Sequence, residues 1–126
     1  MRLWHELLIP YLPRMQLTGQ HRECCALRGN GWGRRHSVVN YVFDHPPSYL
    51  VRYHYLIMNE MKSRWMRPDT IWFVPEYRGK NCAPWPPELV DLSTAPEKYV
   101  YPEHNGRYLR ECVNNLADKG ITIKWR

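Results

Sequence analysis

The stretch that decides the fold lies at residues 14–33 and reads RMQLTGQHRECCALRGNGWG. Prolines precede it, at Pro10 and Pro13, but none interrupts it. The glycines that close the stretch adopt conformations that end helices. The sequence therefore predicts a helix over residues 14–28, although Gly19 inside it is an unfavourable helix residue.

Two further helices are predicted downstream. One is expected over residues 46–66, with Asp44 as its cap and prolines in its first turn. The other is expected over residues 105–119, with Asn105 as cap and Gly120 just past its end. Apolar residues at helical spacing predict the buried faces, made by Tyr49, Leu50, Tyr53, Ile57, Met61 and Trp65 in the first of these helices and by Tyr108, Leu109, Cys112 and Leu116 in the second.

The remaining segments are expected to be mostly irregular. Six prolines fall in residues 75–102, which disfavours regular structure there. This proline-rich arm is also rich in aromatic residues, so we expect it to wrap over the helices. Residues 38–43 are expected to form a short strand or a buried extended segment. The predicted fold is mainly α: one compact domain over residues 1–126, with three main helices and long irregular loops.

Composition excludes several classes of protein. Apolar residues make up 44% of the 126 residues, enough for a real core, so the chain is not a disordered tail. The chain has no run of 18 apolar residues, so no membrane span is predicted. Pro10 and Pro13 interrupt the N-terminal segment, so no secretory signal is predicted either. Two of the four cysteines are adjacent and the others distant, which favours reduced thiols in the cytoplasm over a disulfide scaffold. We expect a monomer without a membrane partner.

The net charge of +6 is concentrated in one half of the chain. Residues 1–67 contain ten Lys and Arg against four Asp and Glu, whereas residues 68–126 contain eight of each. A basic surface attracts polyanions such as nucleic acid. The alternative is a solvated basic face that serves solubility.

Two segments could carry chemistry. In His21-Arg22-Glu23, the carboxylate is either an acid/base group in a cationic cleft or a salt-bridge partner of the arginines. The glycine-rich residues 29–33 and the following Arg34 and Arg35 either approach and neutralise a phosphate or form a flexible turn. Their spacing matches no nucleotide-binding fingerprint, so no nucleotide cofactor is predicted.

Metal and thiol chemistry receive little support from the sequence. His21, Cys24 and Cys25 could bind a metal with a distant Cys82 or Cys112, but the paired spacing of zinc sites is absent and packing is the favoured role. No histidine is placed to activate a cysteine nucleophile. The N-terminal amine, whose pKa is near 8 in ordinary termini, is a further candidate nucleophile beside Arg2, although most termini have no chemical role.

Several blocks resemble the phage-type pyrimidine-dimer DNA glycosylases, also called phage endonuclease V. The block from Leu8 to Glu23 is similar to the family's first helix, which ends in an aromatic–Arg–Glu triplet. The resemblance continues over residues 49–69 and returns at residues 75–79 and 101–104. The opening MRLWH and the block HRECCALRGNGWG, residues 21–33, resemble a bacterial branch of that family.

The resemblance implies a compact, mostly helical fold and a defined chemistry. In the family the N-terminal amine attacks the sugar carbon of a damaged nucleotide, displaces the base as an imine forms, and cuts the strand by β-elimination. A glutamate matching Glu23 is the key acid, and arginines matching Arg2 and Arg22 hold phosphates. No metal and no cofactor is implied.

The sequence departs from the family in several places. The family presents a small threonine at its terminus, whereas here Met1 is followed by Arg2 and lies one residue farther from Glu23 than the family's nucleophile. Ala26 stands where the family has another arginine, with Arg28 nearby. The family's aromatic tail is reduced to Trp125, and a proline-rich insertion follows Gly79. The lesion or modified base is therefore left open.

We interpret the chain as a DNA glycosylase with AP-lyase activity in base excision repair, acting on double-stranded DNA with a damaged or modified base. The alternatives are a non-catalytic nucleic-acid-binding protein on the same fold and an unrelated small-molecule enzyme. Trp32 either fills the stack that an extruded base leaves or packs the loop. The predicted catalytic residues are Met1 and Glu23, and the predicted DNA-binding residues are Arg2, His21, Arg22, Arg28, Trp32, Arg34, Arg35 and Arg78.

Overall fold

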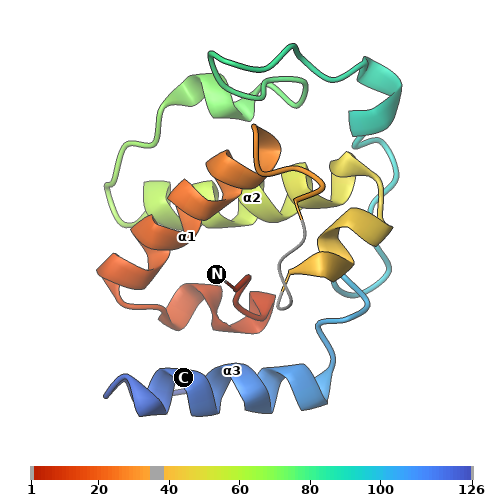
Figure 1. The fold of residues 1–126 in the computed structure, drawn as a ribbon. Helices are drawn as coiled ribbons and strands as arrows, with labels where there is room; N and C mark the ends of the chain where they lie inside the picture. The colour runs from red at the N-terminus through yellow and green to blue at the C-terminus, as the bar shows by residue number, and fades with distance from the viewer. Residues whose placement is uncertain (1, 35–38, 126) are drawn as a thin grey trace.

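A computed structural model describes residues 2–34 and 39–125, and Figure 1 shows its arrangement. Its three longer helices are α1 (Arg14–Arg28), α2 (Pro47–Ser63) and α3 (Gly106–Asp118). Four short 3-10 helices connect them: η1 (Glu6–Tyr11), η2 (Asn40–Asp44), η3 (Thr70–Phe73) and η4 (Pro87–Val90). The described residues contain no strand. The prediction of a mainly α fold with three main helices is confirmed.

Helices α1 and α2 pack against each other to form the centre of the core (Figure 1). The buried stripe of α1 contains Leu17, Cys24 and Leu27, which recur at helical spacing. Burying such apolar stripes against each other is the main source of helix stability in a protein of this size. The facing stripe of α2 consists of Leu50, Tyr53, Ile57 and Met61.

The N-terminal segment lies between this helix pair and α3 (Figure 1). Leu3 and His5 are almost fully buried, so this segment lies inside the fold. The Tyr108 hydroxyl of α3 donates to the Leu3 carbonyl over 2.5 Å. Helix α3 begins as predicted, with the Asn105 side chain accepting from the Tyr108 N–H at 2.9 Å. The first residues are therefore fixed from both sides.

The proline-rich arm wraps over α2, as predicted. Its Trp85 and Val90 bury themselves against Val51 of α2 in a second, smaller apolar cluster. Arg52 donates to the carbonyls of Leu92 and Thr94 at 2.9 and 2.8 Å and fastens the arm farther along. Of the described helices, none has both the length and the apolar character required to cross a membrane.

The prediction of a strand or extended segment over residues 38–43 is wrong where the structure describes it. Residues 40–44 form η2, and Val38 lies outside the described residues. A 3-10 turn brings Val39 and Val42, three positions apart, to the same buried side. Asp44 therefore belongs to η2 and does not cap α2, whose N-cap is Pro46.

Helix α2 ends three residues earlier than predicted, and Trp65 leaves the buried stripe. Trp65 has φ 64° and is 93% exposed. The Met66 N–H returns to the Met61 carbonyl at 2.9 Å and the Trp65 N–H to that of Lys62 at 3.0 Å, the pattern of a Schellman C-cap. This reversal places Met66, 8% exposed, in the apolar position that Trp65 was expected to fill.

Candidate active site

The buried side chain of Gln20 joins α1 to the N-terminal segment. Its Oε1 accepts from the Trp4 N–H at 2.7 Å, and its Nε2 donates to the Arg2 carbonyl at 2.9 Å. The Tyr53 hydroxyl, which donates to the Trp4 carbonyl at 2.6 Å, lies 2.9 Å from the same Oε1. Gln20 thereby fixes the backbone that directly follows the terminal residue.

Glu23 lies one helical turn beyond Gln20 and shares its amide. The Gln20 Nε2 donates to Glu23 Oε2 at 2.9 Å. Partial burial raises the pKa of the Glu23 carboxyl, and hydrogen bonds from the Arg2 backbone and from Gln20 offset part of that rise. A carboxyl whose pKa is raised toward neutrality can both give and take a proton. The structure thus places a titratable group beside the start of the chain.

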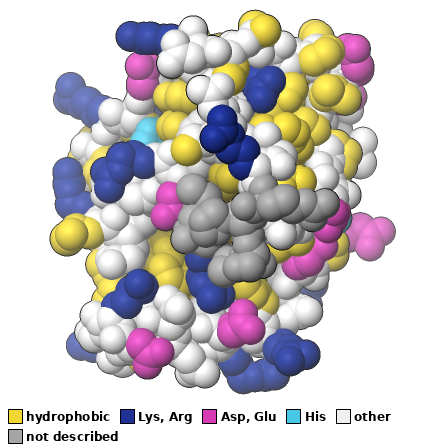
Figure 2. Space-filling view, viewed as in Figure 1, with side chains coloured by type: hydrophobic (Ala, Val, Ile, Leu, Met, Phe, Trp, Pro, Cys, Tyr) yellow, Lys and Arg dark blue, Asp and Glu magenta, His cyan; other side chains and the backbone are white. Residues whose placement is uncertain are grey.

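The arginines predicted for this site differ in their exposure. Arg2 is half-buried, 3.4 Å from Glu111 and over the Tyr108 ring, whereas Arg22 and Arg34 are exposed. In Figure 2, many Lys and Arg side chains lie on the side of the molecule where α1 lies, with acidic side chains scattered across the same face. Met1 and Arg35, also predicted for this site, lie outside the described residues.

Arg28 is a structural clamp, so its predicted contact with DNA is wrong. Its side chain is 0% exposed. Its guanidinium also lies over the Trp72 ring, with 5.1 Å to the centroid, and burial lowers its pKa. A phosphate cannot reach this cation. Its two terminal nitrogens donate to the carbonyls of Trp72, Val74, Pro75 and Tyr77 at 2.8, 2.9, 3.4 and 2.9 Å.

Arg78 and Trp32 also have structural contacts. Arg78 donates to the carbonyls of Arg28 and Gly29 at 2.8 and 3.2 Å, and so satisfies the C-terminal end of α1. Its guanidinium stacks over Trp85 at 4.5 Å. The half-buried Trp32 packs edge-on against Phe43 and Trp85, which supports the loop-packing alternative for this tryptophan.

His21 ends a chain of hydrogen bonds that starts at Arg28. Arg28 donates to His54 Nδ1 at 3.0 Å, and His54 Nε2 lies 2.8 Å from His21 Nδ1. Because a guanidinium only donates, His54 must carry its proton on Nε2 and donate it to His21. His21 then carries its proton on Nε2. Burial lowers the pKa of both histidines, which keeps this neutral arrangement.

The same histidines, with Cys25, form a group that could hold a metal ion. Ligand atoms of His21, Cys25 and His54 lie within 4.8 Å of one another. A metal on His54 Nε2 would move the imidazole proton to Nδ1, where it would face the Arg28 N–H, donor against donor. The group therefore suits a hydrogen-bond chain better than a metal centre. Burial also raises the pKa of the Cys25 thiol to about 11, which keeps it protonated and unsuited to nucleophilic attack.

Comparison with known protein families assigns the chain to one of them. A family model described as pyrimidine dimer DNA glycosylase matches residues 1–74, more than half of the 126 residues. The chain belongs to the pyrimidine dimer DNA glycosylase family. Its substrate is accordingly DNA. No curated protein and no solved structure matches the chain.

The sequence analysis gave no role in the candidate site to two residues. Gln20 and Tyr53 hold the N-terminal segment and the amide that reaches Glu23. Gln20 occupies the buried stripe of α1 between Leu17 and Cys24, where an apolar residue is expected. A polar residue at such a position signals a buried hydrogen-bond network, and that signal was available in the sequence.

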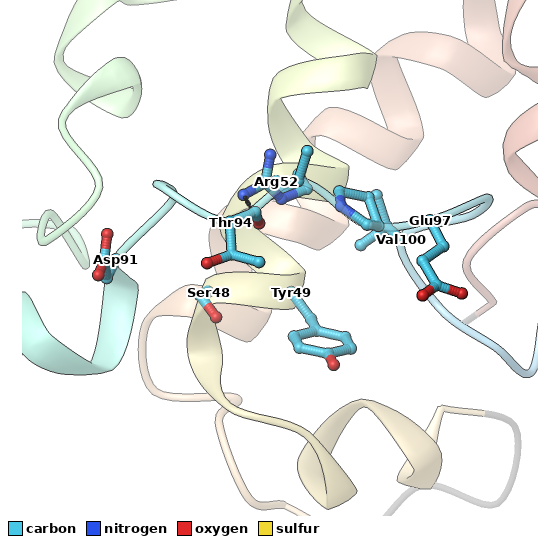
Figure 3. A pocket seen from close by; sticks show the side chains of 9 residues that line it. Ser48, Tyr49, Arg52, Asp91, Thr94, Glu97 and Val100 are labelled. Atoms are coloured by element: carbon cyan, nitrogen blue, oxygen red, sulfur yellow. Dashed lines mark hydrogen bonds between the residues drawn. The ribbon is translucent and has the colours of Figure 1, made fainter.

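One hollow of the glycosylase lies apart from Glu23, between the arm and the start of α2 (Figure 3). It has a volume of about 320 Å³, and its lining includes Tyr49, Arg52, Asp91 and Glu97. The Arg52 guanidinium is engaged by arm carbonyls, while both carboxylates repel a phosphate. The hollow does not suit the DNA backbone.

Proposed function

We propose that the protein is a DNA glycosylase with associated AP-lyase activity that works through an imine on its N-terminal amine. The observation that supports this most is the Glu23 carboxyl, held by Gln20 against the Arg2 backbone. A carboxyl beside the start of the chain can serve an amine that must lose and gain protons. Met1 is the proposed nucleophile and Glu23 the proposed acid/base.

The chemistry proceeds in two stages. The amine nitrogen forms a bond to the anomeric sugar carbon as the bond to the base breaks, and the base leaves with the electron pair. Opening of the sugar ring then gives an imine, with the proton for the ring oxygen supplied by Glu23. Loss of a proton from the neighbouring sugar carbon expels the 3′ phosphate and cuts the strand. Each proton transfer needs a nearby acid/base group, and burial, which raises the pKa of the Glu23 carboxyl, favours that role.

Arg2, Arg22, Arg34 and Arg35 are the proposed phosphate contacts. Arg22 and Arg34 are exposed and free to meet a strand, and Arg2 lies next to the proposed nucleophile. His21 presents its Nε2 proton as a neutral donor and is proposed as a further polar contact. Extrusion of the target nucleotide would bring the sugar carbon within reach of the amine.

Trapping the imine tests the proposal. Incubating the protein with abasic-site duplex DNA and borohydride should reduce the imine to a stable covalent adduct that maps to the N-terminal peptide. An N-terminal tag displaces the amine by about 3.5 Å for each added residue. Because a misplacement of about 1 Å can cost a hundredfold in rate, the tagged protein should bind DNA without forming the adduct.

A C-terminally tagged protein is the matched control and should both bind and cleave. Equal cleavage by the two tagged proteins would assign the nucleophile to a lysine and remove Met1 from the mechanism. Salt-sensitive DNA binding with no adduct in either protein would instead support the non-catalytic binding function.

One exposed face of α1 is proposed to approach the DNA backbone closely. Gly19, Arg22 and Ala26 lie three and four positions apart and so share this face. A Cβ at Gly19 would meet only the Arg22 guanidinium, at 3.9 Å. Packing therefore gives no reason for a residue that costs a helix about 1 kcal/mol relative to alanine. Close passage of a DNA strand over this position would explain the glycine.

Gly19→Ala is expected to separate stability from binding. The free energy of unfolding in urea should rise by about 0.5–1 kcal/mol, while the Kd for abasic-site duplex, measured by fluorescence anisotropy, should increase severalfold. Gly106→Ala is the matched control, because a Cβ there also meets only an arginine guanidinium, Arg110 Nη1, at 3.9 Å. Unchanged duplex affinity in Gly19→Ala would place DNA on another face.

A further inference from the structure

Trp65 is displayed on the surface by a backbone conformation that disfavours it. Among the described residues it is the one non-glycine residue with a positive φ, at 64°, a region in which bulky side chains are rare. Its side chain is 93% exposed. Glycine would fit this C-cap position better, and nothing in the core contacts the indole closely enough to require it. The fold therefore carries a cost for presenting this ring to solvent.

The ring is held in a defined place. The two C-cap hydrogen bonds to the Lys62 and Met61 carbonyls, 3.0 and 2.9 Å long, fix the backbone on both sides of it. Met66, which follows, is anchored in the core. The indole thus extends from a rigid helix end, so little backbone entropy is lost when a ligand orders it.

Beside the ring lies a groove with a volume of about 370 Å³. Lys62 and Arg67 contribute cations to its lining, and Phe73 contributes an apolar ring. The Lys62 ammonium lies 5.2 Å from the Phe73 ring centroid. The described residues that line the groove include no carboxylate; the neighbouring Asp69 uses its side chain to cap η3 through the Ile71 N–H. An exposed aromatic ring that shares a groove with two cations has the charge and the flat surface to fit an aromatic anion.

We propose that this groove, lined by Trp65, Lys62, Arg67 and Phe73, is a second DNA contact in which Trp65 stacks on an unpaired base. Stacking on an exposed aromatic ring, with cations along the backbone, is how proteins hold single strands without reading sequence. Paired bases inside a duplex offer no free face, so the ligand is a single-stranded or displaced stretch. The inference takes DNA as the substrate class and does not depend on the role of Glu23.

Binding of a labelled oligothymidine, dT12, tests the proposal. Trp65→Gly removes the ring and suits the positive φ, so the variant should fold with equal or greater thermal stability. Its Kd for dT12, measured by fluorescence anisotropy, should rise about tenfold, whereas its Kd for a 12-base-pair duplex should change less than about twofold. Trp65→Phe should restore most of the dT12 affinity. Quenching of tryptophan emission by dT12 should be smaller in Trp65→Gly than in the native protein.

Leu89→Ala, which shortens another exposed apolar side chain on the arm, is the control and should bind dT12 normally. Native affinity of Trp65→Gly for dT12 would overturn the proposal, as would an equal loss for duplex and single strand, since that would show a phosphate contact only. A Trp65-dependent response to phosphatidylglycerol vesicles but not to dT12 would also overturn it. Two further measurements separate the groove from the site at Glu23. Trp65→Gly should still cleave abasic duplex, and Glu23→Gln should still bind dT12.

Discussion

Glu23→Gln is expected to lower the rate of strand cleavage at an abasic site by about 10²–10⁴-fold, the usual contribution of a positioned acid/base. Glutamine keeps the size of the side chain and its hydrogen bond to Gln20, but it cannot exchange protons. The Kd for the same duplex should stay equal or fall, because an anion leaves a surface that binds phosphates. Single-turnover cleavage and anisotropy on one DNA substrate measure both quantities.

Glu111→Gln is the matched control for this variant. Glu111 is also a carboxylate beside Arg2, at 3.4 Å, but it is largely exposed and lies on α3. Its replacement should leave the cleavage rate within about twofold, since exposed ion pairs contribute little. If Glu23→Gln cleaves as fast as the native protein, Glu23 is a salt-bridge partner of the arginines and not the acid/base.

Arg28→Met should produce the largest loss of stability of any single change considered for this chain. Methionine approximates the length of the arginine stem but leaves the carbonyls of residues 72, 74, 75 and 77, and His54 Nδ1, without their donor. Buried acceptors that lose a charged partner cost several kcal/mol, so the free energy of unfolding in urea should fall by about 3–5 kcal/mol.

Arg52→Met provides the comparison, because Arg52 also donates to two carbonyls of the arm but is partly exposed. Water can replace the hydrogen bonds of Arg52. The free energy of unfolding should therefore fall by less than half as much in Arg52→Met as in Arg28→Met. A stability of Arg28→Met close to the native value, together with a reduced salt dependence of DNA binding, would contradict the clamp and return Arg28 to the DNA surface.

Local sequence signals predicted the helices well and their junctions poorly. Asn105 and the glycines after Arg28 act on their own neighbours, so the ends of α1 and the start of α3 followed from the sequence. The end of α2 did not, because Trp65 takes a left-handed conformation that glycine normally supplies. The segment after residue 38 has strand-like composition, but a strand requires a partner and the described residues offer none.

Residue type identified the cations of the site but not their roles. Arg28 and Arg22 look alike in the sequence, yet one is buried under the arm and the other is exposed. Which of them meets solvent depends on where residues 72–77 cross α1, and no local pattern encodes that crossing. Gln20 and Tyr53 were overlooked for the same reason, since their partners are backbone groups distant in sequence.

The Arg28 clamp has a consequence for how this chain can change over evolution. Its acceptors are backbone carbonyls, so the side chains of residues 72–77 can be replaced without loss of the hydrogen bonds. Such a joint tolerates sequence drift on one side while keeping its geometry. The family model matches residues 1–74, so Arg28 donates to carbonyls inside the matched range and to carbonyls just beyond it. The clamp therefore ties the chain after residue 74 to α1, and the two parts should unfold together.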